Sequence, residues 1–170
     1  MAFDALLRVL LAAVPLLLAA SVAAQDYRSK ASGNWNALST WEQDNGSGWV
    51  DATVLPTNAS GAITVRSPHT VTVSDNRSAD ELTVASGATL AMAGGTFTMA
   101  DGAGVDLDVQ GTPNWTGGTL AGPGSCAIAS GATANLSSGN TKSLNSVLTN
   151  NGTINWTAGV INGSGNIQNT

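Results

Sequence analysis

The chain has a single histidine and a single cysteine, the residue types that most often act as base and nucleophile near neutral pH. His69 stands in SPHTVTV, where a catalytic imidazole would need an orienting partner, and Asp75 and Asp80 are nearby in sequence. We favour the alternative that His69 closes the first full coil of the fold. Cys126 is equivalent to Ile167 in a sequence repeat described below. We therefore expect a buried thiol that packs as a small apolar side chain, not a reactive one.

The stretch DGAGVDLD, residues 101–108, is the one candidate for a metal site. If Leu107 and its alternate neighbours point inward, Asp106 and Asp108 lie side by side outside, and with Asp101 they could hold a hydrated Ca²⁺ through oxygen ligands. The glycine–aspartate repeat of calcium-binding solenoids must recur, however, and here it occurs once. A solvated acidic patch is the competing interpretation, and we favour it.

Two tryptophans, Trp115 and Trp156, occupy equivalent positions of the repeat. Facing outward, they would offer stacking platforms for sugar rings. In the stretch Ile154–Asn155–Trp156–Thr157, however, the indole is in phase with Ile154, which favours burial.

Polysaccharide lyases and hydrolases on β-helical folds need a basic residue or a pair of carboxylates in a groove. Arg66, Arg77 and Lys142 are scattered along this chain, and residues 110–170 contain no acid. We expect no catalytic residues and no cofactor, so the sequence predicts a protein that is not an enzyme.

Short alternating runs such as HTVTV (69–73), ATLAM (88–92) and GTFTM (95–99) indicate strands with one buried face, separated by turn-forming residues. Their apolar centres recur about every eight residues. Longer similarities overlay them: VASGATLAM (84–92) returns 44 residues later, and QGTPNWTGGTLAGPG (110–124) returns 41 residues later as NGTINWTAGVINGSG (151–165). Such self-similarity is typical of solenoids.

Two coils per period, each of roughly 20 to 22 residues with three strands and three corners, predict an all-β, right-handed parallel β-helix. Two packed antiparallel sheets are the main competitor. Gly and Asn suit the corners, and Asn side chains can stack into hydrogen-bonded ladders. The predicted inward set is Ile63, Val65, Val71, Val73, Leu82, Val84, Leu90, Met92, Phe97, Met99, Val105, Leu107, Leu120, Ile128, Leu136, Leu144, Ile154 and Ile161.

The sequence predicts two further segments before the solenoid. A charged start, the apolar run Val9–Ala20 and a small-residue end predict a cleavable signal peptide over 1–24, in preference to an uncleaved anchor helix. Residues 25–60 are not repetitive and contain Trp35, Trp41 and Trp49, so we interpret them as an N-terminal cap. Residues 61–170 then form the coils, incomplete at the C-terminus.

The charge distribution is uneven. All ten acidic residues beyond the signal segment precede Val109, and Lys142 is the single charged side chain from 110 to 170. A net charge of −5 argues against nucleic acid, or a membrane beyond the export signal, as a partner.

The order GNWN…STWE…GW…ITVRSPHTVTV…LTVASGATL, over about residues 32–92, resembles the N-terminal end of exported bacterial surface and adhesin-like proteins with a parallel β-helix. The resemblance implies a fold and a secreted or cell-surface location more than an activity. No catalytic residue carries over from it, and this chain departs from the family in being short and lacking a sorting or anchoring segment.

We therefore expect a non-catalytic structural or adhesive segment of an exported protein. The alternatives are the N-terminal part of a β-helix carbohydrate-active enzyme and a glycan-binding module. Surface glycans or other cell-surface proteins are the expected partners. The polar residues 166–170 could blunt the last coil, but we favour an open edge, end-to-end self-association, and a chain that is the start of a longer protein or a truncated product.

Overall fold

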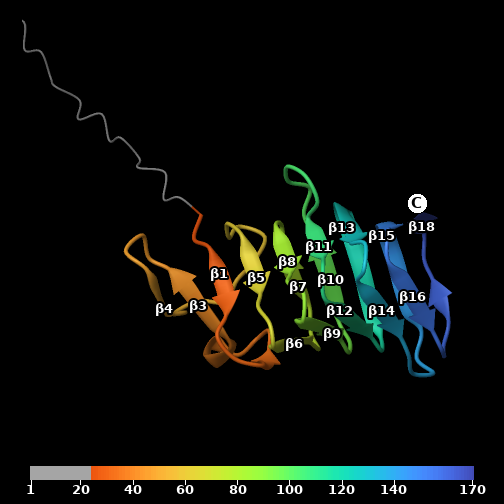
Figure 1. The fold of residues 1–170 in the computed structure, drawn as a ribbon, viewed down its shortest axis with the longest axis horizontal. Coiled ribbons are helices and arrows are strands. Elements are labelled where there is room, and N and C mark those ends of the chain that lie inside the picture. The colour runs from red at the N-terminus through yellow and green to blue at the C-terminus, as the bar shows by residue number, and fades with distance from the viewer. Residues whose placement is uncertain (1–23) are drawn as a thin grey trace, which may run out of the picture.

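The computed structural model describes residues 24–170, so the predicted signal peptide lies outside the described residues except for Ala24. The chain winds into a parallel β-solenoid of about 5 turns with 50% of its residues in strands and 2% in helix. Figure 1 shows the coils stacked in sequence order from the N-terminal end to the C-terminal end. Residues 82–84 and 89–92 pair in parallel with the coils on either side and not with each other. The parallel solenoid is confirmed and the antiparallel sandwich is wrong.

From β5 onward, the coils contribute strands to three faces, as predicted. Face 1 contains β1 (Tyr27–Ser29), β5 (Ile63–Val65), β8 (Leu82–Val84), β11 (Leu107–Val109), the second halves of β13 (Gly118–Ile128) and β15 (Lys142–Asn150), and β18 (Asn166–Asn169). Face 2 contains β2 (Gly33–Asn34), β6 (Thr70–Val73), β9 (Thr89–Met92), β12 (Thr112–Trp115), β14 (Thr133–Leu136) and β16 (Thr153–Trp156). Face 3 contains β7 (Arg77–Ala79), β10 (Thr96–Met99), the first halves of β13 and β15, and β17 (Ile161–Asn162).

The period-2 alternation builds the core directly. In β9, Leu90 and Met92 are buried while Thr89 and Ala91 face out, and the same pattern recurs in β6 one coil earlier. Stacking then places apolar side chains in continuous columns, of which Leu82–Leu107–Cys126–Leu148 on face 1 is one. Most of the predicted inward set is buried.

The 41-residue repeat spans two coils, as predicted. On face 2, Trp115 pairs with Leu136, which pairs with Trp156. Coil length is less regular than expected. The register on face 1 steps from Ile63 to Leu82, 19 residues, and then from Leu82 to Leu107, 25 residues. The extra residues form a loop at 100–106.

That loop explains one wrong prediction. Val105 belongs to the inward set by alternation, yet it is 45% exposed. Strand β11 begins only at Leu107, so the period-2 pattern does not extend back to residue 105. Ile154 and Ile161 are partly buried against the core, because they belong to the last described coil.

Glycine is required where a corner touches the coil before it. Gly122, in the bend of β13, has φ = 114°, and a Cβ there would lie 2.0 Å from the Met99 carbonyl oxygen. Gly163, its equivalent in the 41-residue repeat, has φ = 124° and the same 2.0 Å approach to the Leu144 carbonyl oxygen. Any side chain would push neighbouring coils apart, which is why the repeat keeps glycine there.

The predicted asparagine ladder is confirmed on face 2. The Asn135 amide nitrogen donates to Asn114 Oδ1 at 3.0 Å, and the Asn155 amide nitrogen donates to Asn135 Oδ1 at 3.3 Å. Asn150 and Asn169 make a similar contact at 2.9 Å on face 1. Amides can stack in this way because each has both a donor and an acceptor, whereas stacked carboxylates would repel.

The N-terminal end has antiparallel structure. β3 (Trp41–Asp44) pairs antiparallel with β1, and β4 (Trp49–Asp51) pairs antiparallel with β3; a short 3₁₀ helix, η1 (Leu38–Thr40), precedes β3. Trp35 and Trp41 are fully buried in edge-to-face contact, with ring centroids 4.9 Å apart, and Trp35 makes a similar contact with Phe97 at 5.3 Å. Trp35 and Trp41 thus join this segment to the core of the coils.

Phe97→Ala tests this packing, with Val105→Ala as its matched control, since alternation alone treats both residues as inward. Removing the buried Phe97 ring should lower the free energy of unfolding by roughly 3–5 kcal/mol. Removing the exposed Val105 side chain should change it by less than about 0.5 kcal/mol. Urea unfolding of both variants measures the difference, and equal losses would contradict the assigned burial.

Candidate functional site

The acidic loop at 100–106 is organised around Asp106, whose side chain is 2% exposed. Its Oδ1 accepts the Gly102 amide at 2.8 Å, and its Oδ2 accepts the Ser125 amide at 2.6 Å and the Ser125 hydroxyl at 3.2 Å. The carboxylate therefore joins the loop to the next coil.

This corrects the predicted geometry of the calcium candidate. Asp106 was expected outside beside Asp108, but it turns inward because its oxygens satisfy backbone amides that the loop leaves without strand partners. Asp108 faces out and accepts a hydrogen bond from Gln110 at 2.7 Å, and Asp101 is exposed. Across residues 24–170, no group of three or more His, Cys, Asp or Glu side chains is placed to hold a metal ion.

The Asp106 carboxyl is also the clearest electrostatic feature of the loop. Burial by itself raises its pKa, but the hydrogen bonds from Ser125 and Gly102 outweigh burial and hold the pKa below its ordinary value of 3.8. The charged form is thus the one that the fold stabilises.

Cys126 lies in the core column of face 1, between Leu107 and Leu148, as its equivalence to Ile167 predicts. Burial, helped by the negative charge of Asp108, raises the pKa of its thiol to about 12. A nucleophilic cysteine needs the opposite, a lowered pKa and access to solvent.

The two equivalent tryptophans have different surroundings. Trp115 is buried between Met92 and Leu136, as predicted. Trp156 was also expected to be buried, but it is 54% exposed, because a described coil packs on one side of it only. Its indole nitrogen donates to the Ala158 and Gly159 carbonyl oxygens at 3.1 and 3.3 Å.

Lys142, the single charge in the C-terminal part of the chain, is completely buried. Its ammonium donates to the carbonyl oxygens of Ser138, Asn140 and Ala158 at 3.1–3.3 Å. These carbonyls belong to the corners of two successive coils. The side chain therefore clamps two corners together and is not displayed to a ligand.

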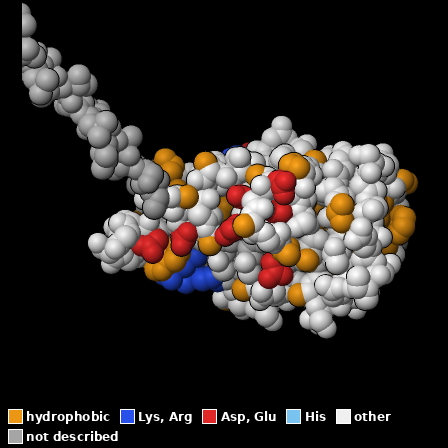
Figure 2. Space-filling view, turned by 90° about the horizontal axis from the view of Figure 1, so that it is seen from above, with side chains coloured by type: hydrophobic (Ala, Val, Ile, Leu, Met, Phe, Trp, Pro, Cys, Tyr) orange, Lys and Arg blue, Asp and Glu red, His pale blue; other side chains and the backbone are white. Residues whose placement is uncertain are grey.

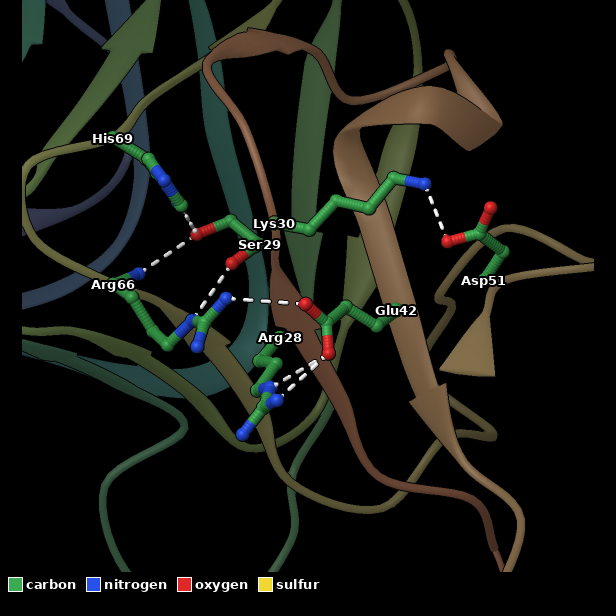
Figure 3. A network of polar contacts seen from close by, with 7 residues as sticks. All are labelled: Arg28, Ser29, Lys30, Glu42, Asp51, Arg66 and His69. Atoms are coloured by element: carbon green, nitrogen blue, oxygen red, sulfur yellow. Dashed lines mark hydrogen bonds and ion pairs between the residues drawn. The ribbon is translucent and has the colours of Figure 1, made fainter. Parts of the chain in front are cut away.

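The largest polar network lies at the N-terminal end (Figure 3). Glu42 on β3 accepts two hydrogen bonds from Arg28 on β1, at 2.7 and 3.0 Å, and one from Arg66 at 3.3 Å. The Arg28 guanidinium also lies 4.1 Å above the ring of the partly exposed Trp49. Three of the five Lys and Arg residues beyond position 23 meet here, the third being Lys30, which pairs with Asp51 at 2.5 Å.

His69 belongs to this network. Its Nδ1 lies 2.9 Å from the Ser29 hydroxyl, which also accepts the Arg66 amide at 2.8 Å. A serine–histidine pair can generate a nucleophile only if the hydroxyl reaches a substrate, and Ser29 is fully buried. Asp75, one of the partners considered for His69, pairs with Arg77, whose hydrogen bond holds the Asp75 pKa below its ordinary range. The contact between Ser29 and His69 therefore holds β1 against the turn at 66–69.

Sequence reasoning missed the roles of Ser29, Glu42 and Lys142. Each role includes a contact with a residue on another coil, 40 positions away for Ser29, 24 for Glu42 and 16 for Lys142, and no local sequence pattern predicts such contacts. The inward phase of Lys142 with Leu144 is the one available signal, since the alternation places both inside.

No family model, no curated protein and no solved structure matches this chain. The resemblance of residues 32–92 to exported surface proteins therefore stays a hypothesis. None of the helical segments in residues 24–170 is long and apolar enough to cross a membrane.

Asp106→Asn should destabilise the chain by about 1.5–3 kcal/mol at pH 7, because an amide replaces a carboxylate that accepts several hydrogen bonds. The folded-state pKa is lowered, so the wild-type advantage is complete above pH 3.8 and shrinks as the pH falls through the folded-state pKa. Urea unfolding between pH 7 and pH 2.5 measures this gap.

Asp108→Asn is the matched control for this experiment, because Asp108 faces out two residues away. Its substitution should cost less than about 0.5 kcal/mol. Equal losses from the two variants, or a gap for Asp106→Asn that does not change with pH, would contradict the assigned role.

Cys126 should resist a thiol reagent such as 5,5′-dithiobis(2-nitrobenzoate). With a pKa of about 12 and a buried sulfur, native Cys126 should react at pH 8 at least about 100-fold more slowly than the same thiol in 6 M guanidinium chloride. Absorbance of the released thiolate follows both rates. Prompt reaction of the native chain would overturn the assignment of Cys126 to the core.

Proposed function

We propose that this chain is a non-catalytic structural or adhesive segment of an exported surface protein. The proposal rests on one observation: the side chains of this chain that could be reactive make structural contacts within the fold. Cys126 fills a core column, Asp106 and Lys142 bind backbone groups, and Ser29 and His69 bind each other. The side chains that point outward from the described coils then remain available for contact with other molecules.

The outer surface supports an adhesive role for the later coils. Figure 2 shows charged side chains over the N-terminal half and an almost uncharged surface toward the C-terminal end. The ladder Asn114–Asn135–Asn155 sets amides at a regular spacing along face 2. Such a surface can form hydrogen bonds with neutral sugars or polar protein surfaces, and surface glycans or other cell-surface proteins are the partners we propose.

The N-terminal segment, residues 25–60, has the role of a cap in this proposal. An open edge of a sheet invites pairing with other chains. Here β3 occupies the outer edge of β1, and Glu42 with Arg28 and Arg66 holds the two strands to the first coil. Signal-directed export and a surface location belong to the same proposal, with support from the apolar run Val9–Ala20.

A glycan-binding module is a second candidate, because two tryptophans are accessible. Trp156 is the more exposed of them, and Trp49 lies at the other end of the molecule under the Arg28 guanidinium. An aromatic face that reaches solvent can stack on a sugar ring.

One set of measurements tests the proposed function. Incubation with acidic and neutral polysaccharides should release no reducing ends or unsaturated products, and turnover that survives repurification would overturn the proposal. In parallel, a glycan array is probed with the wild type, Trp156→Ala and Trp49→Ala. Binding lost in only one variant identifies the glycan-binding candidate and its location, whereas binding that both variants keep favours adhesion through the asparagine-rich faces.

A further inference from the structure

The sequence contains three asparagine–glycine pairs, Asn45–Gly46, Asn151–Gly152 and Asn162–Gly163. This dipeptide is prone to spontaneous deamidation, in which the glycine nitrogen attacks the carbonyl carbon of the asparagine side chain. Glycine favours the attack because it has no side chain to hinder it and its backbone rotates freely. The sequence alone gives the three pairs equal standing, but the structure places them in different surroundings.

The pair Asn45–Gly46 lies at the tip of the hairpin formed by β3 and β4, at the N-terminal end of the stack (Figure 1). Residues 45–48 are all exposed. Gly46 has φ = 81°, and apart from its chain neighbours no atom lies within 4 Å of the position that a Cβ would take. Water therefore reaches this turn, and no packed neighbour opposes its rotation.

Two hydrogen bonds in this turn hold the groups that would react. The Gly46 amide donates to Asp44 Oδ1 at 2.9 Å, which places a carboxylate on the proton that the attacking nitrogen must lose. The Ser47 amide donates to Asn45 Oδ1 at 3.0 Å, which places an N–H donor on the oxygen that becomes negative during the attack. The turn thus supplies both a base and an oxyanion donor.

We propose that Asn45 deamidates spontaneously, with Asp44 as the base and the Ser47 amide as the oxyanion donor. The Gly46 nitrogen forms a bond to Asn45 Cγ, and the bond from Cγ to Nδ2 breaks, which leaves a five-membered succinimide. The Gly46 amide proton passes through Asp44 to the departing Nδ2, which leaves as ammonia. Water then opens the ring, giving aspartate by attack at Cγ or isoaspartate by attack at the main-chain carbonyl carbon. Neither step is a redox reaction.

The pair Asn162–Gly163 is held in a strand ladder. Asn162 pairs with Ser143 of the previous coil, whose hydroxyl donates to Asn162 Oδ1 at 2.8 Å. Gly163 approaches the Leu144 carbonyl so closely that a Cβ would lie 2.0 Å from its oxygen. These contacts oppose the rotation that brings the side-chain carbon to the next nitrogen, so we expect slow deamidation here.

The pair Asn151–Gly152 is held in a corner. The Asn151 amide donates to the Ile128 carbonyl oxygen at 2.9 Å, and a Cβ on Gly152 would lie 2.5 Å from the Ala132 carbonyl oxygen. The Gly152 amide also has a side-chain acceptor, Asn150 Oδ1 at 3.2 Å. That acceptor is a neutral amide and does not take up a proton at neutral pH. This pair therefore lacks both the freedom and the base of the hairpin tip.

Deamidation would alter the outer edge of the N-terminal cap. The Asn45 amide donates to the Gly48 carbonyl oxygen at 3.1 Å, and Asp44 pairs with Trp49 where the hairpin closes. Isoaspartate adds one atom to the backbone and so disturbs this closure, and with it the position of Trp49 beneath the Arg28 guanidinium. Aspartate only adds a negative charge to the turn. The inference goes beyond the proposed function, because the reaction needs nothing but the folded hairpin and water.

Incubation of the full chain, purified as it accumulates on expression, tests the proposal at pH 7.5 and 37 °C. Peptide mapping by mass spectrometry follows the conversion of each asparagine to an acid. In the folded chain, Asn45 should react at least about 10-fold faster than Asn151 or Asn162, because only Asn45 reacts without opening a coil. In 6 M guanidinium chloride the three should react at similar rates. Similar rates at the three sites of the folded chain would overturn the proposal, and this comparison needs no variant.

Asp44→Asn tests the base, because an amide still accepts the Gly46 N–H but does not take up its proton. The variant should slow deamidation of Asn45 at least about 3-fold in the folded chain. Asp51→Asn is the matched control, since it removes the same charge from the facing strand of the hairpin, and it should leave the rate unchanged. Circular dichroism confirms that both variants fold. A rate that Asp44→Asn leaves unchanged, or that Asp51→Asn lowers equally, refutes the proposed chemistry.

Discussion

Hydrogen bonding between successive coils is the interaction on which the whole structure depends. From β5 onward, a strand does not pair with its neighbour in sequence, so its backbone groups are satisfied by the coils on either side. That requirement keeps stacked residues in register, which turns alternation along the chain into core columns such as Leu82–Leu107–Cys126–Leu148. It also excludes side chains at Gly122 and Gly163, where neighbouring backbones touch.

This pairing fails at the corners, and two buried charged side chains, Asp106 and Lys142, bind the corner backbone instead. Asp106 accepts the Gly102 amide of the 100–106 loop and the Ser125 amide of the next coil. Lys142 donates to three corner carbonyls near residues 138–158. Each buried charge thus has a sign opposite to the partial charges of the corner groups that it binds. From the sequence alone, Asp106 and Lys142 would instead suggest metal binding or catalysis.

The fold could be predicted from the sequence because the fold is periodic. Alternation within strands and the 41-residue repeat predict three faces, two coils per period, the burial of Cys126 and the asparagine ladder. Residues where the period breaks were not predictable. Val105 precedes the strand to which alternation assigns it, and Trp156 lacks a second neighbouring coil in the described structure. The network of Ser29, Glu42 and His69 could not be predicted from the sequence, because its contacts depend on how the folded chain winds.

Parallel pairing of these strands, one coil apart, can be tested with nuclear Overhauser effects between backbone protons. In a uniformly labelled sample, parallel pairing predicts cross-strand contacts that link Thr64 to Thr83 and Thr83 to Asp108, with the spacing of a parallel ladder. It predicts none between residues 82–84 and 89–92. Contacts that instead join those two neighbouring segments in an antiparallel ladder would contradict the solenoid and every inference that rests on it.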